Sequence, residues 1–594
     1  MKPPKRRLIL LFAILLFSTT AAALAAPQDK ADEFLRPLLS SPGGGSATQA
    51  KITLIVQTDR PFSPDMERHV RLLGGRVKER FSIVQGFSAE LPAHSLRVLA
   101  VLPWVKRISA DVQVKRLSEY AVPAVGADVA NTVYGLDGSG VTVAVLDSGI
   151  RADLKDLCDS SGRPRVIKGP NFSPDPKSDS TQDLCGHGTH VAGLIGGNGA
   201  KSTGDRYFRT FRGVAPAVKL LSVKVLDSNG VGTVTGTIKA IEWCLLNKRK
   251  HNIRVINLSL GHPVGESYTT DPLCQAVEAA WKAGIVVVCA AGNRGRAVES
   301  DPNSGPAYFT INSPANDPYV ITVGATKTMW TPSPSDDLMA SYSSIGPTRI
   351  DNILKPDIVA PGNRVISLRA SSSRLSFWDP TNAVPFSYYV VLSARAKESE
   401  DTISPVYYRL SGTSMATAVV SGAAALMIQK DPSITPDTVK ARLMKTAVKQ
   451  WNPYVAYSPL VRGAGLLNIP SALSCADVVN GQALSPTVYI NSDGTIAIQD
   501  ISAVWSGSPT SSTKTTWSDK TTWSDYSLLG DKTTWSDSSL FGDKTTWSES
   551  ALWGDKTTWS DAVLTGDSAL WSDKTTWSES ALWADISRTA LEGE

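Results

Sequence analysis

The chain has 594 residues, of which 42% are hydrophobic, and it carries a formal net charge of only +5. This length predicts several domains with a sizeable globular core, and the small net charge gives no reason to expect nucleic acid as a partner. The charge is unevenly distributed, because residues 514–594 hold 7 basic and 14 acidic residues. The C-terminal part is therefore expected to be a segment distinct from the rest.

The N-terminal sequence predicts the cellular location of the protein. Basic residues within positions 2–7 precede the apolar run 8–17, and small residues come after it. This layout is typical of a secretory signal peptide, here residues 1–25 with cleavage after Ala25, and the run is too short to span a bilayer. Residues 26–50 then indicate a linker. The protein is expected to be secreted and to have no transmembrane anchor.

Residues 51–116 predict a small unit that is independent of the rest of the chain. Its strands and helices alternate in the order β-α-β-β-α-β, which is typical of a ferredoxin-like, split β-α-β sandwich. The strands are expected at 52–57, within 77–91 and at 105–114, and the helices at 66–73 and 95–102.

Residues 117–477 predict an α/β domain with a parallel sheet flanked by helices. Short, nearly continuous apolar runs alternate there with helix-like segments, and such runs fit strands that are covered on both faces. The runs are 141–146, 220–226, 255–260, 285–290 and 319–323. In this architecture active groups collect at the carboxyl ends of the strands.

Three motifs lie at such positions. Asp147 ends the first apolar run, His187 begins a predicted helix between glycines, and Ser414 precedes the apolar helix predicted at 417–428. Taken singly, they fit a loop carboxylate, a structural histidine and a helix cap. His190 comes three positions after His187, but no third ligand has suitable spacing, so no metal site is predicted.

Taken together, the three residues indicate nucleophilic catalysis. A serine hydroxyl is a poor nucleophile until a base removes its proton; histidine is that base, and a carboxylate fixes its tautomer. Asn293 ends another predicted strand and can donate an amide hydrogen bond to a tetrahedral oxyanion. We therefore expect Asp147, His187, Ser414 and Asn293 to form one site.

With these motifs the chain resembles the subtilisin-like serine proteases. The resemblance covers roughly residues 122–476 and rests on Asp147-Ser148-Gly149, His187-Gly188-Thr189-His190 and Gly412-Thr413-Ser414-Met415-Ala416. It implies a subtilisin-like fold and peptide hydrolysis through an acyl-enzyme. Asp147 would orient His187, which acts as general base and then acid, and Ser414 would be the nucleophile. Asn293 and the Ser414 N–H would form the oxyanion hole.

Two further stretches resemble substrate-binding segments of that family. Gly230-Val231-Gly232 resembles the edge that pairs with an extended substrate backbone, and Ser259-Leu260-Gly261 resembles the wall of the pocket for the residue before the scissile bond. Taken alone, they are a glycine turn and a strand end. No acidic residue is evident at the pocket wall, which favours broad or apolar specificity. The chemistry requires no cofactor; structural calcium is common in the family, but no ligand set can be mapped on this sequence.

The resemblance extends to the small unit and also shows departures. Residues 51–116 resemble the family's propeptide, which helps the protease fold and inhibits it, so autoprocessing is expected near 116–122. The family usually has proline four residues after the nucleophile, where this chain has Ala418. The connection 367–408 is long and is expected to shape the substrate cleft or an outer loop.

Six cysteines in an exported chain allow disulfides. The pairings considered are Cys158 with Cys185 and Cys244 with Cys274. Cys289 lies inside an apolar run and is expected to be a buried free thiol.

Residues 478–513 predict a connector with a short hairpin around 488–501, and residues 514–594 repeat every six residues, most visibly as Lys-Thr-Thr-Trp-Ser. Because six is even, the tryptophans of an extended chain share one side, which favours stacked strands or a solenoid-like array. A disordered low-complexity tail is the other interpretation, and both stay open.

The sequence thus predicts a secreted serine endopeptidase that is activated by propeptide removal. Its expected partners are protein or peptide substrates, its own propeptide, and, for the tail, a cell surface, a glycan or another copy. The alternative is a non-catalytic surface or adhesion protein that binds through the repeat tail. The complete Asp-His-Ser set with Asn293 favours the enzyme.

Overall fold

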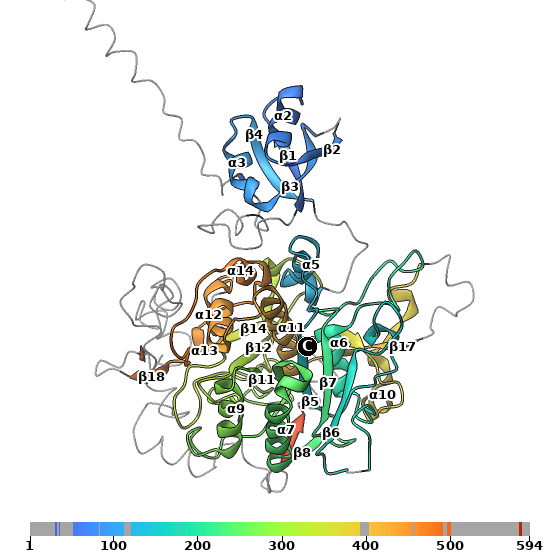
Figure 1. Cartoon of the computed structure of the whole chain (residues 1–594). Coiled ribbons are helices and arrows are strands. Elements are labelled where there is room, and N and C mark those ends of the chain that lie inside the picture. The colour runs from blue at the N-terminus through green and yellow to red at the C-terminus, as the bar shows by residue number, and fades with distance from the viewer. Residues whose placement is uncertain are drawn as a thin grey trace, which may run out of the picture. The chain divides into compact units, whose positions relative to one another are not determined.

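The structure is a computed structural model. It describes residues 30, 31, 35, 51–81, 84–111, 120–175, 177–391, 403–453, 455, 457–490, 496–499 and 581–584. The chain divides into two compact units, Met1–Val112 and Gln113–Glu594 (Figure 1). The expected signal peptide and nearly all of the repeat tail lie outside the described residues. No helix among the described residues is both long and apolar enough to cross a membrane.

The described residues of the first unit form a four-stranded antiparallel sheet with two helices. The sheet order is β2-β3-β1-β4, as in a split β-α-β sandwich. Burial alternates along β1, so every second side chain enters the core. The elements have the expected order, and they are β1 (Lys51–Thr58), α2 (Pro64–Leu72), β2 (Arg76–Arg80), β3 (Gly86–Pro92), α3 (Leu96–Val101) and β4 (Val105–Ala110).

The second unit contains an eight-stranded sheet in the order β13-β12-β11-β9-β5-β7-β6, with β14 also pairing with β12. All neighbours are parallel except β12 and β13. All five predicted apolar runs are strands of this sheet. Its members are β5 (Thr142–Asp147), β6 (Val166–Asn171), β7 (Lys219–Lys224), β9 (Ile253–Leu258), β11 (Val286–Ala290), β12 (Ile321–Lys327), β13 (Leu338–Met339) and β14 (Ile358–Pro361).

Helices cover the sheet, which explains why strands such as β5 and β11 are buried along their whole length. α11 (Thr413–Lys430) is buried from Thr413 to Ile428 and packs against α6 (His187–Gly196) and several strands. A helix that is apolar on every side belongs in the interior, and α11 lies there. The other helices are α4 (Ala121–Ala124), α5 (Ala127–Thr132), α7 (Val234–Leu246), α8 (Lys248–His251), α9 (Pro272–Lys282), α10 (Arg374–Trp378), α12 (Pro436–Thr446), α13 (Pro459–Arg462) and α14 (Ile469–Ser474).

Three small sheets complete the described part of the second unit. β15 (Val365–Leu368), β17 (Ile403–Leu410) and β16 (Ala383–Pro385) form one of them, and the expected hairpin is β18 (Thr487–Ile490) with β19 (Ile496–Gln499). The third has the order β10-β20-β8. Its strands are β8 (Val231–Thr233), β10 (Leu260–Gly261) and β20 (Ala581–Ala584), the last of which comes from the repeat tail.

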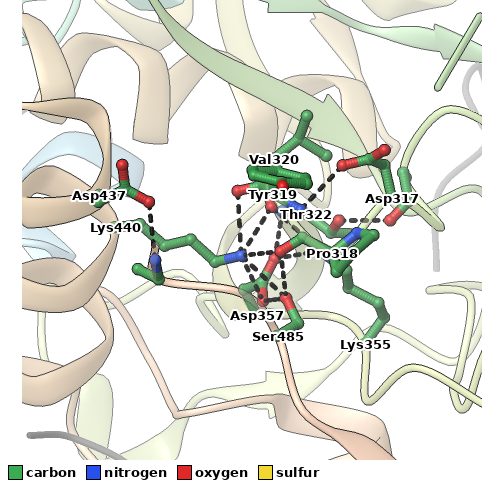
Figure 2. Close-up of polar contacts among 12 residues, drawn as sticks. Asp317, Pro318, Tyr319, Val320, Thr322, Lys355, Asp357, Asp437, Lys440 and Ser485 are labelled. Carbon is green, nitrogen blue, oxygen red and sulfur yellow. Dashed lines mark hydrogen bonds and ion pairs between the residues drawn. The ribbon is translucent and has the colours of Figure 1, made fainter. Parts of the chain in front are cut away.

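A buried ionic cluster ties α12 and the C-terminal connector to the sheet (Figure 2). Lys440 Nζ donates to the carbonyls of residues 318–320 at 2.7–3.2 Å and to Ser485 Oγ at 2.9 Å. Asp357 lies between two ammonium groups, 2.7 Å from Lys355 Nζ and 3.5 Å from Lys440 Nζ. Burial lowers the pKa of Lys440 to about 7, against the opposing effect of Asp357. The cluster is fully buried, so each charge depends on its partners.

Replacing Lys440 by methionine is therefore expected to destabilise the folded state by about 3 to 5 kcal/mol, because it leaves Asp357 with one buried counter-charge and frees several carbonyls. Urea unfolding of the phosphonate-inactivated protein would measure this change without autolysis. Lys239→Met on the exposed face of α7 is the matched control. A loss no larger than that of the control would contradict the role given to the cluster.

The two cysteine pairings considered from the sequence are wrong. All six cysteines are free thiols, and Cys289 is buried as expected. Cys158 Sγ instead contacts the Leu154 carbonyl at 3.6 Å, and Cys274 Sγ contacts Asn316 Oδ1 at 3.3 Å. The thiols are therefore used as small core side chains, a role that free cysteine fills readily.

Candidate active site

Asp147 and His187 form a buried pair at the carboxyl end of β5. Asp147 is the last residue of β5 and His187 the first of α6. His187 Nδ1 lies 2.9 Å from Asp147 Oδ1 and 3.0 Å from Oδ2, and both side chains are essentially unexposed. Asp147 Oδ1 also accepts the Ser148 N–H at 2.7 Å. This geometry holds the imidazole with its Nε2 side directed away from the carboxylate.

Glycine at position 188 permits this approach of α6 to β5. A Cβ on Gly188 would lie 2.2 Å from the Gly149 carbonyl oxygen and 3.1 Å from Asp147 Cβ. The nearest atom is a backbone oxygen, which cannot rotate away as a side chain could. Any side chain at position 188 would therefore separate the first turn of α6 from the end of β5. The glycine beside His187 is thus a requirement of packing and fixes the Asp147–His187 distance.

Asp183, which was not among the residues predicted from the sequence, anchors the start of α6. Its buried carboxylate accepts the Gly186 N–H at 2.7 Å, the Thr189 N–H at 2.8 Å and the Ser148 hydroxyl at 2.8 Å. Ser148 Oγ in turn accepts the Gly188 N–H at 3.0 Å. Burial raises the pKa of Asp183, and the hydrogen bonds from Thr189 and Gly186 oppose that rise. The sequence did contain a signal for this role, because Asp183 is a carboxylate placed shortly before a predicted helix start.

Replacing Asp183 by asparagine is expected to lower kcat on the order of tenfold or more, with a small change in KM. The amide keeps one acceptor but turns an NH₂ group toward at least one N–H or O–H donor, so the His187 turn shifts. Steady-state kinetics checks this, and Asp153→Asn at an exposed, Arg151-paired carboxylate is the control. An unchanged kcat would contradict a positioning role for Asp183.

Ser414 stands at the N-terminal turn of α11, as its second residue. Gly412 precedes the helix with φ of +148°, a conformation that side chains rarely adopt. Ser414 Oγ donates to the Ser259 carbonyl at 3.3 Å, and Ser259 Oγ donates to the Ser414 carbonyl at 3.0 Å. The hydroxyl is thus placed beside the end of β9 and at the positive end of the buried α11.

Asn293 lies against the same turn. Its Oδ1 accepts the Thr413 N–H at 2.9 Å and the Thr413 hydroxyl at 3.2 Å, which fixes the orientation of the amide. Its Nδ2 is buried and has no hydrogen-bond partner within the described residues, and it lies 3.1 Å from where a Gly412 Cβ would be. An oriented, buried amide donor without an acceptor, held against the turn that carries Ser414, is suited to receive an oxyanion.

His190 belongs to the core and not to the reacting groups. Its Nε2 lies 3.1 Å from the carbonyls of Val365 and Tyr408. Burial, with a smaller effect of His187, lowers the pKa of His190 to about 3, so it is neutral at physiological pH. The described residues contain no cluster of three or more His, Cys, Asp or Glu side chains that could hold a metal ion.

The expected substrate-binding segments are two short strand edges, β8 and β10. Gly232 and Gly261 have no room for side chains, since their Cβ atoms would lie 2.5 Å from the Val225 carbonyl oxygen and 2.8 Å from the Ser313 carbonyl oxygen. Gly230 has φ of +77°, which favours glycine at this turn. Leu260 comes directly after Ser259, so β10 begins beside Ser414.

The long connection 367–408, which follows β15, contacts the segment just before His187. Backbone N–H groups of Arg374 and Leu375, in α10, donate to the carbonyls of Leu184 and Cys185 at 2.8 and 3.1 Å. The sequence predicted that this connection shapes an outer loop or the substrate cleft. The structure shows that part of it holds the backbone next to His187. Ala418, at the position where the family usually has proline, is a buried residue of α11.

The fold and this site define a serine-type endopeptidase built on a parallel α/β sheet. The sequence matches the subtilase family over residues 138–469. It is 36% identical over 405 residues to the serine protease AprX of Bacillus subtilis (strain 168), covering 67% of this chain and 81% of that protein. Subtilisin NAT of Bacillus subtilis subsp. natto is 32% identical over 402 residues, covering 67% and 83%.

A thermostable alkaline protease of Halalkalibacterium halodurans is 30% identical over 433 residues, covering 72% of this chain and 94% of that protein. The chain therefore belongs to the subtilase family of serine proteases. Its parallel sheet flanked by helices is the subtilisin-like fold that the sequence predicted.

Proposed function

We propose that this protease hydrolyses peptide bonds with Ser414 as nucleophile, His187 as general base and Asp147 as the group that orients His187. The observation that carries the proposal is the buried Asp147–His187 pair, with both carboxylate oxygens within 3.0 Å of Nδ1. Such a pair fixes the tautomer in which Nε2 can accept a proton, and it stabilises the imidazolium that forms.

The reaction proceeds in two transfers. Ser414 Oγ, turned from the Ser259 carbonyl toward His187, attacks the scissile carbonyl carbon while His187 Nε2 takes its proton. The oxyanion accepts hydrogen bonds from Asn293 Nδ2 and the Ser414 N–H, then the C–N bond breaks and His187 protonates the leaving amine. Water, deprotonated by His187, hydrolyses the acyl-enzyme and restores Ser414.

The strand edges Gly230-Val231-Gly232 and Ser259-Leu260-Gly261 bind the extended peptide on the side before the scissile bond. Backbone pairing with two edges depends little on side chains, which supports broad or apolar specificity. No metal or cofactor takes part in these steps, since the serine, the histidine and the hydrogen-bond donors supply the nucleophile, the base and the oxyanion stabilisation.

The same proposal covers maturation. Residues 1–25 direct secretion, and the split β-α-β unit within residues 51–116 serves as an inhibitory propeptide that is removed near 116–122. The compact, separate fold of the first unit supports this role.

The testing experiment is N-terminal sequencing of the secreted protein, together with casein hydrolysis by that material. We expect an N-terminus within or close to residues 116–122 and hydrolysis of casein. An active protein that begins at residue 26 would refute the propeptide role, and a folded, processed protein that cleaves no protein substrate would refute the enzymatic role.

A further inference from the structure

A strand from the C-terminal repeat tail lies between the two proposed substrate-binding edges. β20 pairs antiparallel with β8 on one side and with β10 on the other, and it is the red arrow beside β8 in Figure 1. Trp583 is opposite both Val231 and Gly261, Leu582 is opposite Gly232, and Ala584 is opposite Leu260. A central strand paired on both sides has the backbone arrangement of a bound extended peptide.

The direction of β20 leads to the nucleophile. Along β20 from Trp583 to Ala584, the opposite residue of β10 changes from Gly261 to Leu260. The next residue of that segment is Ser259, whose carbonyl accepts the Ser414 hydroxyl. The strand thus fills the place between the edges of β8 and β10, here called the edge-strand cleft, with its carboxyl end directed to Ser414. A substrate must run in this direction if its next peptide bond is to be attacked.

The described site is closed. Ser414 and His187 have no exposed surface, and Asn293 is only 3% exposed. An external polypeptide must therefore displace whatever covers these groups before its carbonyl reaches the hydroxyl. A segment that already lies between both edges is a direct competitor for the same backbone hydrogen bonds.

We propose that the repeat tail is a tethered pseudo-substrate that occupies the edge-strand cleft and competes with external polypeptides. The inference rests on the proposed function of β8 and β10 as substrate edges. It identifies the occupant as a segment of this chain and gives the acidic hexad repeats a regulatory role.

The sequence of the tail suits this role. The stretch Ser-Ala-Leu-Trp occurs three times, at 550–553, 568–571 and 580–583, so more than one copy can enter the cleft. Tethering gives each copy a high effective concentration without additional contacts. Residues 514–594 hold 7 basic and 14 acidic residues, a net charge of −7, whereas residues 117–513, which remain after propeptide removal, hold 35 basic and 32 acidic residues, a net charge of +3. The two parts therefore have opposite charge, which gives a weak attraction.

The test compares two triple variants of the full chain in steady-state hydrolysis of a short chromogenic peptide. Proline removes the backbone donor and disrupts strand pairing. The test variant places proline in the three Ser-Ala-Leu-Trp copies, as Leu552→Pro, Leu570→Pro and Leu582→Pro. The control places it in the same slot of three other hexads, as Thr522→Pro, Thr534→Pro and Thr558→Pro. Intact mass confirms that every protein measured retains its tail.

A tethered competitor raises KM and leaves kcat unchanged. We therefore expect the test variant to have a KM at least about fivefold below that of the unaltered chain, with equal kcat, whereas the control variant matches the unaltered chain. Adding a synthetic peptide of residues 578–586 to the test variant is expected to raise its KM again. Equal KM values for both variants and the unaltered chain would overturn the inference and leave the proposed catalytic function intact. Absence of hydrolysis by all three proteins would overturn the proposed function and this inference together.

Discussion

Replacing Ser414 by alanine is expected to lower kcat by about a millionfold, a magnitude taken over from the catalytic serine of subtilisin itself. Without the hydroxyl no acyl-enzyme forms, and the residual rate depends on oxyanion stabilisation and binding alone. The variant should also fail to remove its own propeptide by cleavage near residues 116–122. Progress curves with a chromogenic peptide and intact mass of the secreted protein measure both effects.

Ser433→Ala is the matched control, because Ser433 is an exposed serine in the turn after α11. It should leave both kcat and processing unchanged. Ser414 is fully buried, so a hydroxyl on the surface cannot take its place. Normal self-processing by the Ser414→Ala protein would therefore show that Ser414 is not the nucleophile.

Replacing Asn293 by alanine is expected to lower kcat by about 10²- to 10³-fold with little change in KM, again a magnitude taken over from the oxyanion asparagine of subtilisin. The amide donates only to the charge that develops in the transition state, so substrate binding is nearly unaffected. Single-turnover and steady-state kinetics on one peptide separate the two quantities.

Asn293 also holds Thr413, and an aspartate variant separates the two roles. Asn293→Asp retains an oxygen that can accept from the Thr413 N–H, which is 2.9 Å away, but it loses the amide donor. If the donor matters, this variant is at least as slow as Asn293→Ala, because it also places a negative charge beside the oxyanion. Near-normal activity of Asn293→Asp would assign Asn293 to holding the turn alone.

The parallel sheet, and the position of the candidate site at one of its ends, could be predicted because their signals are local. Strands covered on both faces must be continuously apolar, and every such run proved to be a strand. Asp147, His187 and Asn293 end strands, come after them or begin helices, positions that a parallel sheet brings to one edge. The structure brings all of them to the end of the sheet where Ser414 lies.

Other features depend on contacts between distant segments. Lys440 is a lysine on an ordinary-looking helix, and only the packing of α12 against residues 318–320 makes it the centre of a buried cluster. Asp183 was missed for a similar reason, since the groups that donate to its carboxylate lie on the turn after β5 and in the first turn of α6. The cysteine pairings were wrong because closeness in sequence does not set the direction of the thiols.

The repeat tail shows the same limit. The even period of six residues left both stacked strands and a disordered tail open. Ala581–Ala584, the part of the tail that the structure describes, is a strand. Its partners, however, are β8 and β10 of the protease unit, more than three hundred residues earlier in the chain. The periodicity of a segment indicates which conformation it favours, but it does not indicate which strand edge the segment will pair with.

The most direct test of the central claim is to react the mature protein with a serine-directed phosphonate and to locate the adduct by mass spectrometry of proteolytic fragments. We predict a single adduct on Ser414, with hydrolysis of casein lost in proportion to labelling. His187→Ala, processed in trans by the unaltered enzyme, should be labelled far more slowly, since the hydroxyl then lacks its base. A folded, mature protein that forms no adduct, or forms it on another residue while Ser414 stays unmodified, would contradict the assignment of this site.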